Sequence, residues 1–283
     1  MSDFEQFINR LEQLVARVEA ILPPVMPAPD WSASAFRWRV HANGHGYLQA
    51  VKHPHRIELD ALKNIDTQKD SLLRNTRQFM AGKSANNVLL TGARGTGKST
   101  LIKAAWNAFA DQGLKIIEVD KTDLLHLASI VDLVGERPEK FIIFCDDLSF
   151  EEGEISYKAL KSVLDGSISA PTANMLFYAT SNRRHLIPQK MRDNLDVSDE
   201  DGEVRPSDSI EEKVSLSERF GLWLSFYPFS QDDYLAAANY WVTQLGGEWD
   251  SKTESAALLW HRTRGARSGR VAWQFARDFV GRE

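Results

Sequence analysis

The spacing of the hydrophobic positions changes along the chain, and each spacing predicts a different kind of element. Between residues 2 and 22, apolar side chains recur every three or four positions, which predicts one amphipathic helix. Ser2 and Glu5 have the spacing of a capping box at its start. The prolines at positions 23, 24, 27 and 29 end this helix and predict a stiff link.

The apolar face of this first helix has two interpretations. Such a stripe usually packs on the core of its own chain, and this is the interpretation we favour. The alternative is a docking helix that binds a partner protein or a neighbouring subunit.

Aromatic and basic residues alternate in the next segment, residues 31–60, as in Phe36, Arg37, Trp38 and Arg39. Stacking and phosphate contacts use these residue types, so the segment could form a surface for nucleic acid. We favour a small extension packed on the main domain, because the chain as a whole is acidic.

From about residue 61 the pattern changes to short apolar runs separated by helical segments. This alternation, with runs that are apolar on both faces, predicts a parallel β-sheet covered by helices on both sides. The five predicted strands are Asn87–Thr91, Leu114–Val119, Phe141–Cys145, Asn174–Thr180 and Leu222–Phe226.

After Pro228 the strand pattern ends, and two helical stretches follow at residues 231–245 and 254–279, separated by two glycines. They predict a small helical lid. We therefore divide the chain into an N-terminal helix, link and extension (1–55), an α/β core (56–228) and the lid (229–283). An acidic stretch at 196–208 is expected to be an exposed loop.

Composition narrows the class of protein. The 283 residues carry a net charge of −5, which does not indicate nucleic-acid binding, although a local basic patch stays open. No apolar run is long enough to cross a membrane, and the N-terminus lacks the pattern of a secretory signal, so we expect a cytoplasmic protein. The single cysteine, Cys145, excludes an internal disulfide and is interpreted as a packing residue.

The strongest chemical motif is the stretch LLTGARGTGKST, which has the P-loop spacing of glycines followed by Lys98 and Ser99. Glycines let the backbone curl so that its N–H groups point at phosphate oxygens, and the following helix adds its positive dipole end. Lys98 would neutralise the β- and γ-phosphates of ATP, and Ser99 would ligate Mg²⁺. The predicted contacts are Gly92, Ala93, Arg94, Gly95, Thr96, Gly97, Lys98, Ser99 and Thr100.

A second motif, FIIFCDDLSF, places two acids at the carboxyl end of a buried strand, where ligands bind in open α/β sheets. Asp146 is expected to hold Mg²⁺ through water. Asp147 stands where many ATP hydrolases carry a glutamate that orients the attacking water. Because aspartate is one methylene shorter, Glu151 and Glu152 remain alternatives for that role.

Three later segments favour an ATP-driven machine over other P-loop proteins. A strand that ends in Asn182, if it lies between the two motif-bearing strands, can contact the γ-phosphate or the attacking water. Arg219 precedes the last strand and is placed to reach the phosphate of a neighbouring subunit; its alternative is a salt bridge to Glu211 or Glu212. Arg270 opens a lid helix and can lean over the nucleotide.

Five segments together resemble an AAA+ ATPase over about residues 56–283. They are the P-loop, the acidic strand end, the TSN tip (180–182), SERFG (217–221) and SGRVAWQFARDF (268–279). NNVLLTGARGTGKST, FCDDLSF and FYATSNRRHL are most similar to a bacterial AAA+ subfamily catalogued as a domain of unknown function. The resemblance implies that Asn182 is sensor 1, Arg219 the arginine finger and Arg270 sensor 2, a role for which Arg262, Arg264 and Arg267 compete. It also implies that Ile65 packs against adenine.

The resemblance implies ATP and Mg²⁺ as cofactors and a homo-oligomeric ring, for which a hexamer is expected, acting on an unknown macromolecule. A slowly hydrolysing switch or loader, which would hold a partner through residues 1–55, is the alternative suggested by Asp147. A small-molecule kinase is the third, and the finger and lid segments count against it.

Overall fold

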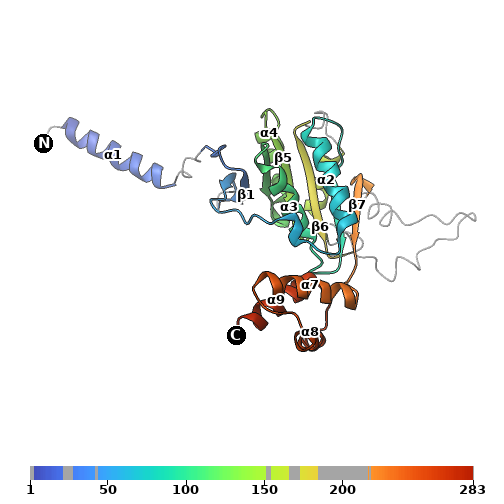
Figure 1. The fold of residues 1–283 in the computed structure, drawn as a ribbon. Helices are drawn as coiled ribbons and strands as arrows, with labels where there is room; N and C mark the ends of the chain where they lie inside the picture. Colours follow the sequence, from blue (N-terminus) through green and yellow to red (C-terminus); the bar gives the residue numbers. More distant parts are fainter. Residues whose placement is uncertain are drawn as a thin grey trace, which may run out of the picture.

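The computed structural model describes residues 3–21, 28–41, 44–150, 154–165, 173–183, 216 and 218–282. The described core is a seven-stranded sheet with helices on both faces, and a helical lid lies below one end of the sheet (Figure 1). The strand order is β2-β1-β4-β5-β6-β3-β7. The predicted α/β architecture with a C-terminal helical lid is therefore confirmed.

Five of these strands are the predicted ones, and they pair in parallel. Their bounds are β3 (Val88–Gly92), β4 (Leu114–Glu118), β5 (Lys140–Cys145), β6 (Met175–Ser181) and β7 (Leu222–Phe226). Strand β6 lies between β3 and β5, which is the position that the interpretation of Asn182 requires.

The predicted number of five strands is wrong, because β1 (Ala35–Val40) and β2 (Gly46–Ala50) extend the sheet beyond β4. Strand β1 is parallel to β4 and antiparallel to β2. Alternate residues of β1 face opposite ways: Phe36 and Trp38 are buried, whereas Arg37 forms an ion pair with Glu118 at 2.8 Å. The alternation of aromatic and basic residues is thus the period of a half-buried strand, and these two aromatics are not available to stack on bases.

Alternate residues of each strand point to opposite faces of the sheet, and each face packs against its own set of helices. Leu90 and Phe144 pack with α2 (Asp66–Met80) and α3 (Lys98–Ala110), whereas Leu89 and Ile143 pack on the opposite face. That opposite face is covered by η2 (Lys121–His126), α4 (Leu127–Val134) and α5 (Ile155–Leu164). A short turn, η1 (Leu59–Ala61), precedes α2.

The lid contains three helices: α7 (Gln231–Gln244), α8 (Ser251–Arg264) and α9 (Gly269–Val280). The helical stretch predicted over 254–279 forms two helices, because Gly265 adopts φ 68° and ends α8. Helix α9 begins at Gly269, where the sequence predicts the helix that Arg270 opens. Ser268 then caps α9 by accepting a hydrogen bond from the Val271 N–H. Tyr234 and Phe275 lie in a core of the lid's own.

The first helix, α1 (Asp3–Ile21), forms where the sequence predicted it. The favoured interpretation of its apolar face is wrong for the described residues, since Phe4, Phe7 and Leu14 are 71%, 62% and 58% exposed. Figure 1 shows α1 standing apart from the sheet. The link at 22–27 and the acidic stretch at 196–208 lie outside the described residues. Among the helices that the structure describes, none is long and apolar enough to span a membrane.

Candidate functional site

The P-loop connects β3 to α3 at the carboxyl edge of the sheet. Gly92, Gly95 and Gly97 have φ values of 134°, 79° and 99°, in the region that favours glycine. A Cβ atom on Gly92 would lie 1.9 Å from the carbonyl oxygen of Phe226, so this position also excludes any side chain. Thr96 donates its hydroxyl hydrogen to the Ala93 carbonyl at 2.8 Å, which closes the loop. Thr100 lies in the first turn of α3.

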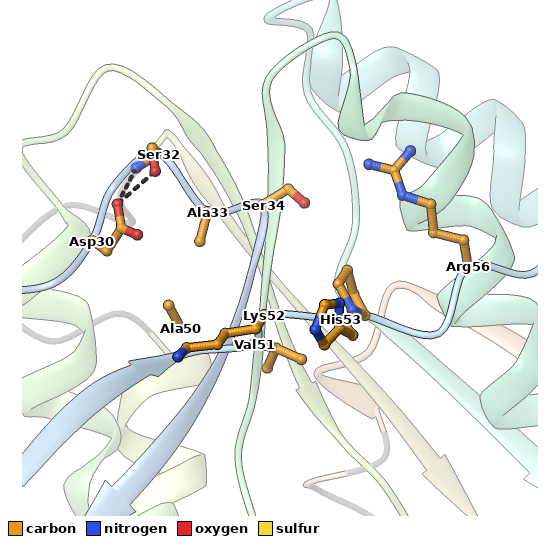
Figure 2. Close-up of a pocket in the computed structure, with 10 residues that line it drawn as sticks. Asp30, Ser32, Ala33, Ser34, Ala50, Val51, Lys52, His53 and Arg56 are labelled. Atoms are coloured by element: carbon orange, nitrogen blue, oxygen red, sulfur yellow. Dashed lines mark hydrogen bonds between the residues drawn. The ribbon is translucent and has the colours of Figure 1, made fainter.

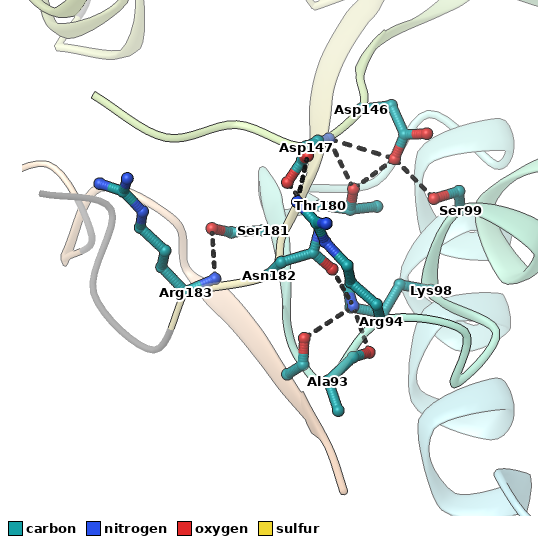
Figure 3. Close-up of polar contacts among 11 residues, drawn as sticks. Ala93, Arg94, Lys98, Ser99, Asp146, Asp147, Thr180, Ser181, Asn182 and Arg183 are labelled. Atoms are coloured by element: carbon teal, nitrogen blue, oxygen red, sulfur yellow. Dashed lines mark hydrogen bonds and ion pairs between the residues drawn. The ribbon is translucent and has the colours of Figure 1, made fainter. Parts of the chain in front are cut away.

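Lys98 is the first residue of α3 and is 95% buried, with 5% of its surface exposed. Its Nζ donates to the carbonyl oxygens of Gly92 at 2.8 Å and Ala93 at 2.7 Å, and to Asn182 Oδ1 at 2.9 Å (Figure 3). Burial lowers the pKa of Lys98, and Asp146 and Asp147 oppose that shift. The ammonium group is therefore held at the loop by oxygen atoms alone.

Asp146 lies directly after β5 and faces Ser99 of the P-loop helix. Its Oδ1 accepts hydrogen bonds of 2.5 Å from Ser99 Oγ and from Thr180 Oγ1 (Figure 3). A serine hydroxyl beside a carboxylate is the oxygen donor set that Mg²⁺ prefers, so these two residues fit the ion.

Asp147 has φ 53°, which is uncommon for a residue other than glycine. Its N–H donates to Thr180 Oγ1 at 3.0 Å, and its Oδ1 accepts from Asn182 Nδ2 at 2.6 Å. Arg94 Nη2 of the P-loop lies 3.8 Å from Asp147 Oδ2. The carboxylate is thus held on one side by the tip of β6 and on the other by the loop.

Asn182 joins the two halves of the site, because its amide oxygen accepts from Lys98 while its amide nitrogen donates to Asp147. The position of β6 between β3 and β5 makes this bridge possible. Thr180 is the residue that sequence reasoning missed: it is 1% exposed and its hydroxyl orients both acids. A hydroxyl residue near the end of a strand that is otherwise buried is the signal that could have identified it.

The lid contacts the P-loop at the start of α9. The N–H of Arg270 donates to the Gly95 carbonyl at 3.3 Å, and a Cβ atom on Gly95 would lie 2.8 Å from Ser268 Oγ. Arg270 and Arg94 both add to the lowering of the pKa of Lys98 that burial causes. Of its competitors, Arg264 stacks on Trp260, with its guanidinium carbon 4.6 Å from the ring centroid.

Ile65 lies beside the P-loop rather than remote from it. It is 5% exposed, and its Cδ1 is 3.5 Å from where a Cβ atom on Gly97 would stand. Leu62 lies equally close, at 3.6 Å. These two side chains form an apolar surface next to the start of α3.

Arg219 lies at the opposite edge of the sheet from the P-loop. Strands β3 and β7 are parallel, with Val88 opposite Leu222, so Arg219 precedes the amino end of β3. It forms an ion pair and hydrogen bond with Asp165, at the end of α5, which raises the pKa of Arg219. Its predicted alternative partners, Glu211 and Glu212, lie outside the described residues, as do Glu151 and Glu152.

Two other features of the described chain are distinct from this site. Burial raises the pKa of Cys145 to about 12, so its thiol stays protonated at neutral pH and serves packing. A cavity of about 590 Å³, lined by Asp30, Ser32, Lys52, His53 and others, lies between the segments on either side of β1 and β2 (Figure 2). In it, Ser32 donates to Asp30 from both its N–H and its hydroxyl.

Comparison with known proteins gives a family and a fold. The family described as "Protein of unknown function (DUF815)" matches residues 31–283. None of the curated proteins compared matches the sequence.

Among solved structures, the A156S mutant of RuvB from Thermotoga maritima is 15% identical with a TM-score of 0.50, and the match covers 78% of this chain and 63% of that one. RuvB itself is described as a Holliday junction branch migration motor. DnaA from Aquifex aeolicus bound to AMPPCP is 14% identical with a TM-score of 0.49, over 74% of this chain and 59% of that one. The RuvB match shows an AAA+ fold, and this chain spans less than two-thirds of either relative.

The close approach at Gly92 yields a test of the loop geometry. We expect Gly92→Ala to destabilise the fold by more than about 3 kcal/mol, because the strain of positive φ, roughly 1–2 kcal/mol, adds to a clash with the Phe226 carbonyl. Gly113→Ala is the matched control, since Gly113 has φ 93° but no heavy atom within 4 Å of the added Cβ. Urea unfolding measures both, and equal losses would contradict the predicted clash.

Proposed function

The chain belongs to the DUF815 family, and we propose that it binds and hydrolyses ATP as an AAA+ protein. The observation that carries this proposal is the hydrogen-bonded network in which Asn182 joins Lys98 to Asp147, beside Asp146 and Ser99. A glycine-rich turn without a ligand needs no buried ammonium group and no pair of acids beside it. All of these groups converge at the carboxyl edge of the sheet, where α/β proteins bind ligands.

Each part of the site suits one part of MgATP. The backbone N–H groups of the P-loop and the positive end of α3 would hold phosphate oxygens, with Lys98 between the β- and γ-phosphates. Ser99 and Asp146 would hold Mg²⁺, which supplies charge neutralisation on the phosphates when bound. Ile65 and Leu62 offer an apolar surface for the adenine ring, and Arg270 adds positive charge from the lid.

For hydrolysis, Asp147 would orient a water molecule and accept its proton. The water oxygen bonds to the γ-phosphorus as the bond from that phosphorus to the β–γ bridging oxygen breaks, which leaves ADP and phosphate. The Asn182 side chain contacts both Lys98 and Asp147. When a γ-phosphate replaces the Asn182 amide beside Lys98, the amide would move and would reposition the Asp147 carboxylate that orients the water.

The arginine finger would come from a second copy of the chain. The four residue steps from Val88 to Gly92 span about 13 Å of strand, and Arg219 lies beyond the far end of that distance from its own P-loop. We therefore propose a ring of subunits, with a hexamer as the expected form, that uses ATP to remodel an unidentified macromolecule.

The slow switch or loader remains the second candidate, and one observation favours it. Asp147 has a shorter side chain than glutamate, and both Asn182 and Arg94 contact its carboxylate. An acid held in this way could favour ATP retention over turnover, with partner binding through the N-terminal region.

The ring proposal predicts a rate that depends on protein concentration. ATP hydrolysis per subunit should rise as wild-type protein is concentrated, and Arg219→Ala should abolish the rise while ATP binding persists, because a finger contributes on the order of 10³–10⁵ in rate. Asp165→Ala is the control: it also breaks the Arg219–Asp165 pair but keeps the arginine. If both variants lose activity equally, Arg219 is a structural residue and not a finger.

Replacing Asp147 separates the motor from the switch. Asp147→Asn should lower the single-turnover hydrolysis rate by roughly 10²–10⁴ with little change in ATP affinity, since it removes the proton acceptor. If the protein is a motor, the single-turnover hydrolysis rate of Asp147→Glu should stay within about tenfold of the wild-type rate. A hydrolysis rate in Asp147→Glu well above that range would identify the native protein as a switch.

A further inference from the structure

The exposed apolar face of α1 is a feature that the ATP site leaves unused. Six of its side chains, which we call the α1 stripe, are between 36% and 71% exposed; they are Phe4, Phe7, Ile8, Leu11, Leu14 and Val15. The three described hydrophobic cores contain no residue of α1. A stripe of this size on a helix requires a partner surface.

The spacing within the stripe is that of a helix that packs on other helices. Phe4, Phe7, Leu11 and Leu14 are separated by three, four and three residues, which is the heptad spacing of a coiled-coil seam. Ile8 and Val15 widen the seam on one side. A widened seam contacts more than one neighbouring helix.

Opposite charges line the two edges of the stripe. Successive residues on a helix are rotated by about 100°, so Glu12 and Arg10 flank Leu11 on opposite sides. Glu5, seven residues before Glu12, lies on the same edge as Glu12, and Arg17, seven residues after Arg10, lies on the same edge as Arg10. One edge thus carries only acids, to which Glu19 belongs as well, whereas the other edge carries both arginines and Asp3 and has a net positive charge.

This charge pattern favours a second α1 helix as the partner and favours parallel over antiparallel packing. When two copies of α1 pack in parallel about a rotation axis along the bundle, the glutamate edge of one faces the arginine edge of the next. In antiparallel packing, glutamates face glutamates and arginines face arginines. We propose that α1 packs with α1 of other copies of this chain in a parallel bundle.

The chemistry of α1 counts against a membrane surface as the occupant. The sequence of residues 3–21 contains four acids and two arginines, a net charge of −2. Helices that lie on membranes are rich in Lys and Arg on the polar face, because lipid headgroups are often anionic. The edges of α1 instead complement each other.

A parallel bundle of α1 helices would hold the AAA+ domains close together, and it does not require any contact between those domains. Helix α1 lies outside residues 31–283, which the family shares, so the bundle would be an addition to the common domain. The segment from residue 22 to 30 can span at most about 30 Å, which keeps the tethered domains at high effective concentration.

Charge reversal in the full-length protein tests the proposal without nucleotide. Light scattering should give a multiple of the 32.0 kDa chain mass for wild type. Arg10→Glu with Arg17→Glu should give the single-chain mass, because both edges become acidic, as should Glu5→Arg with Glu12→Arg. An equimolar mixture of the two variants should recover the higher mass.

Two controls fix the interpretation. Gln6→Glu with Gln13→Glu adds charge on the side of α1 away from the stripe and should leave the mass unchanged. Phe4→Cys should give disulfide-linked dimers under oxidation, since parallel helices bring their first turns together; the native Cys145 is buried and should give none.

Three results would overturn the proposal: a monomeric wild-type protein, an unchanged mass in the Arg10→Glu, Arg17→Glu variant, or no cross-link through Cys at position 4. None of these results depends on ATP. Lys98→Ala should assemble as wild type does, so failure of the ATPase proposal and failure of the α1 bundle are distinguishable.

Discussion

The burial of the Lys98 ammonium group is the constraint on which the rest of the site depends. A charge removed from water must be held by oxygen atoms, and here two P-loop carbonyls and the Asn182 amide supply them. The loop must therefore curl through glycines, and β6 must lie next to β3 to deliver Asn182. The same placement of β6 brings Thr180 against both acids. The curled P-loop, the order of the strands and the orientation of the two acids thus all depend on how the Lys98 ammonium group is held.

Much of this arrangement could be predicted from sequence because it follows from local patterns. The P-loop spacing, the acids after a buried strand and the polar tip of β6 each depend on a few neighbouring residues. Parallel strands carry their carboxyl ends to one edge, so the convergence of Asp146 and Asn182 followed from topology. Thr180 escaped because its role depends on atoms from a different strand.

The errors have physical reasons as well. The sequence predicts residues 31–60 only as a packed extension and not as strands of the sheet, because the basic residues of β1, which pair with Glu118 and Asp120, interrupt the apolar run that marks the other strands. The sequence predicts the start of α9 near Arg270, but the end of α8 depends on a single glycine in the left-handed region, which a helical pattern of apolar residues does not reveal. For α1, the periodicity predicts the helix but not what covers it, since a stripe that faces its own core and one that faces another chain have the same spacing.

The central claim is that Lys98 and its neighbours form a site for MgATP, and calorimetric titration tests it most directly. Wild-type protein titrated with ATP in the presence of Mg²⁺ should bind one nucleotide per chain, and Lys98→Ala should bind at least about tenfold more weakly, a difference of about 1.4 kcal/mol. Absence of binding by the wild-type protein, or equal affinities for the two proteins, would contradict the claim.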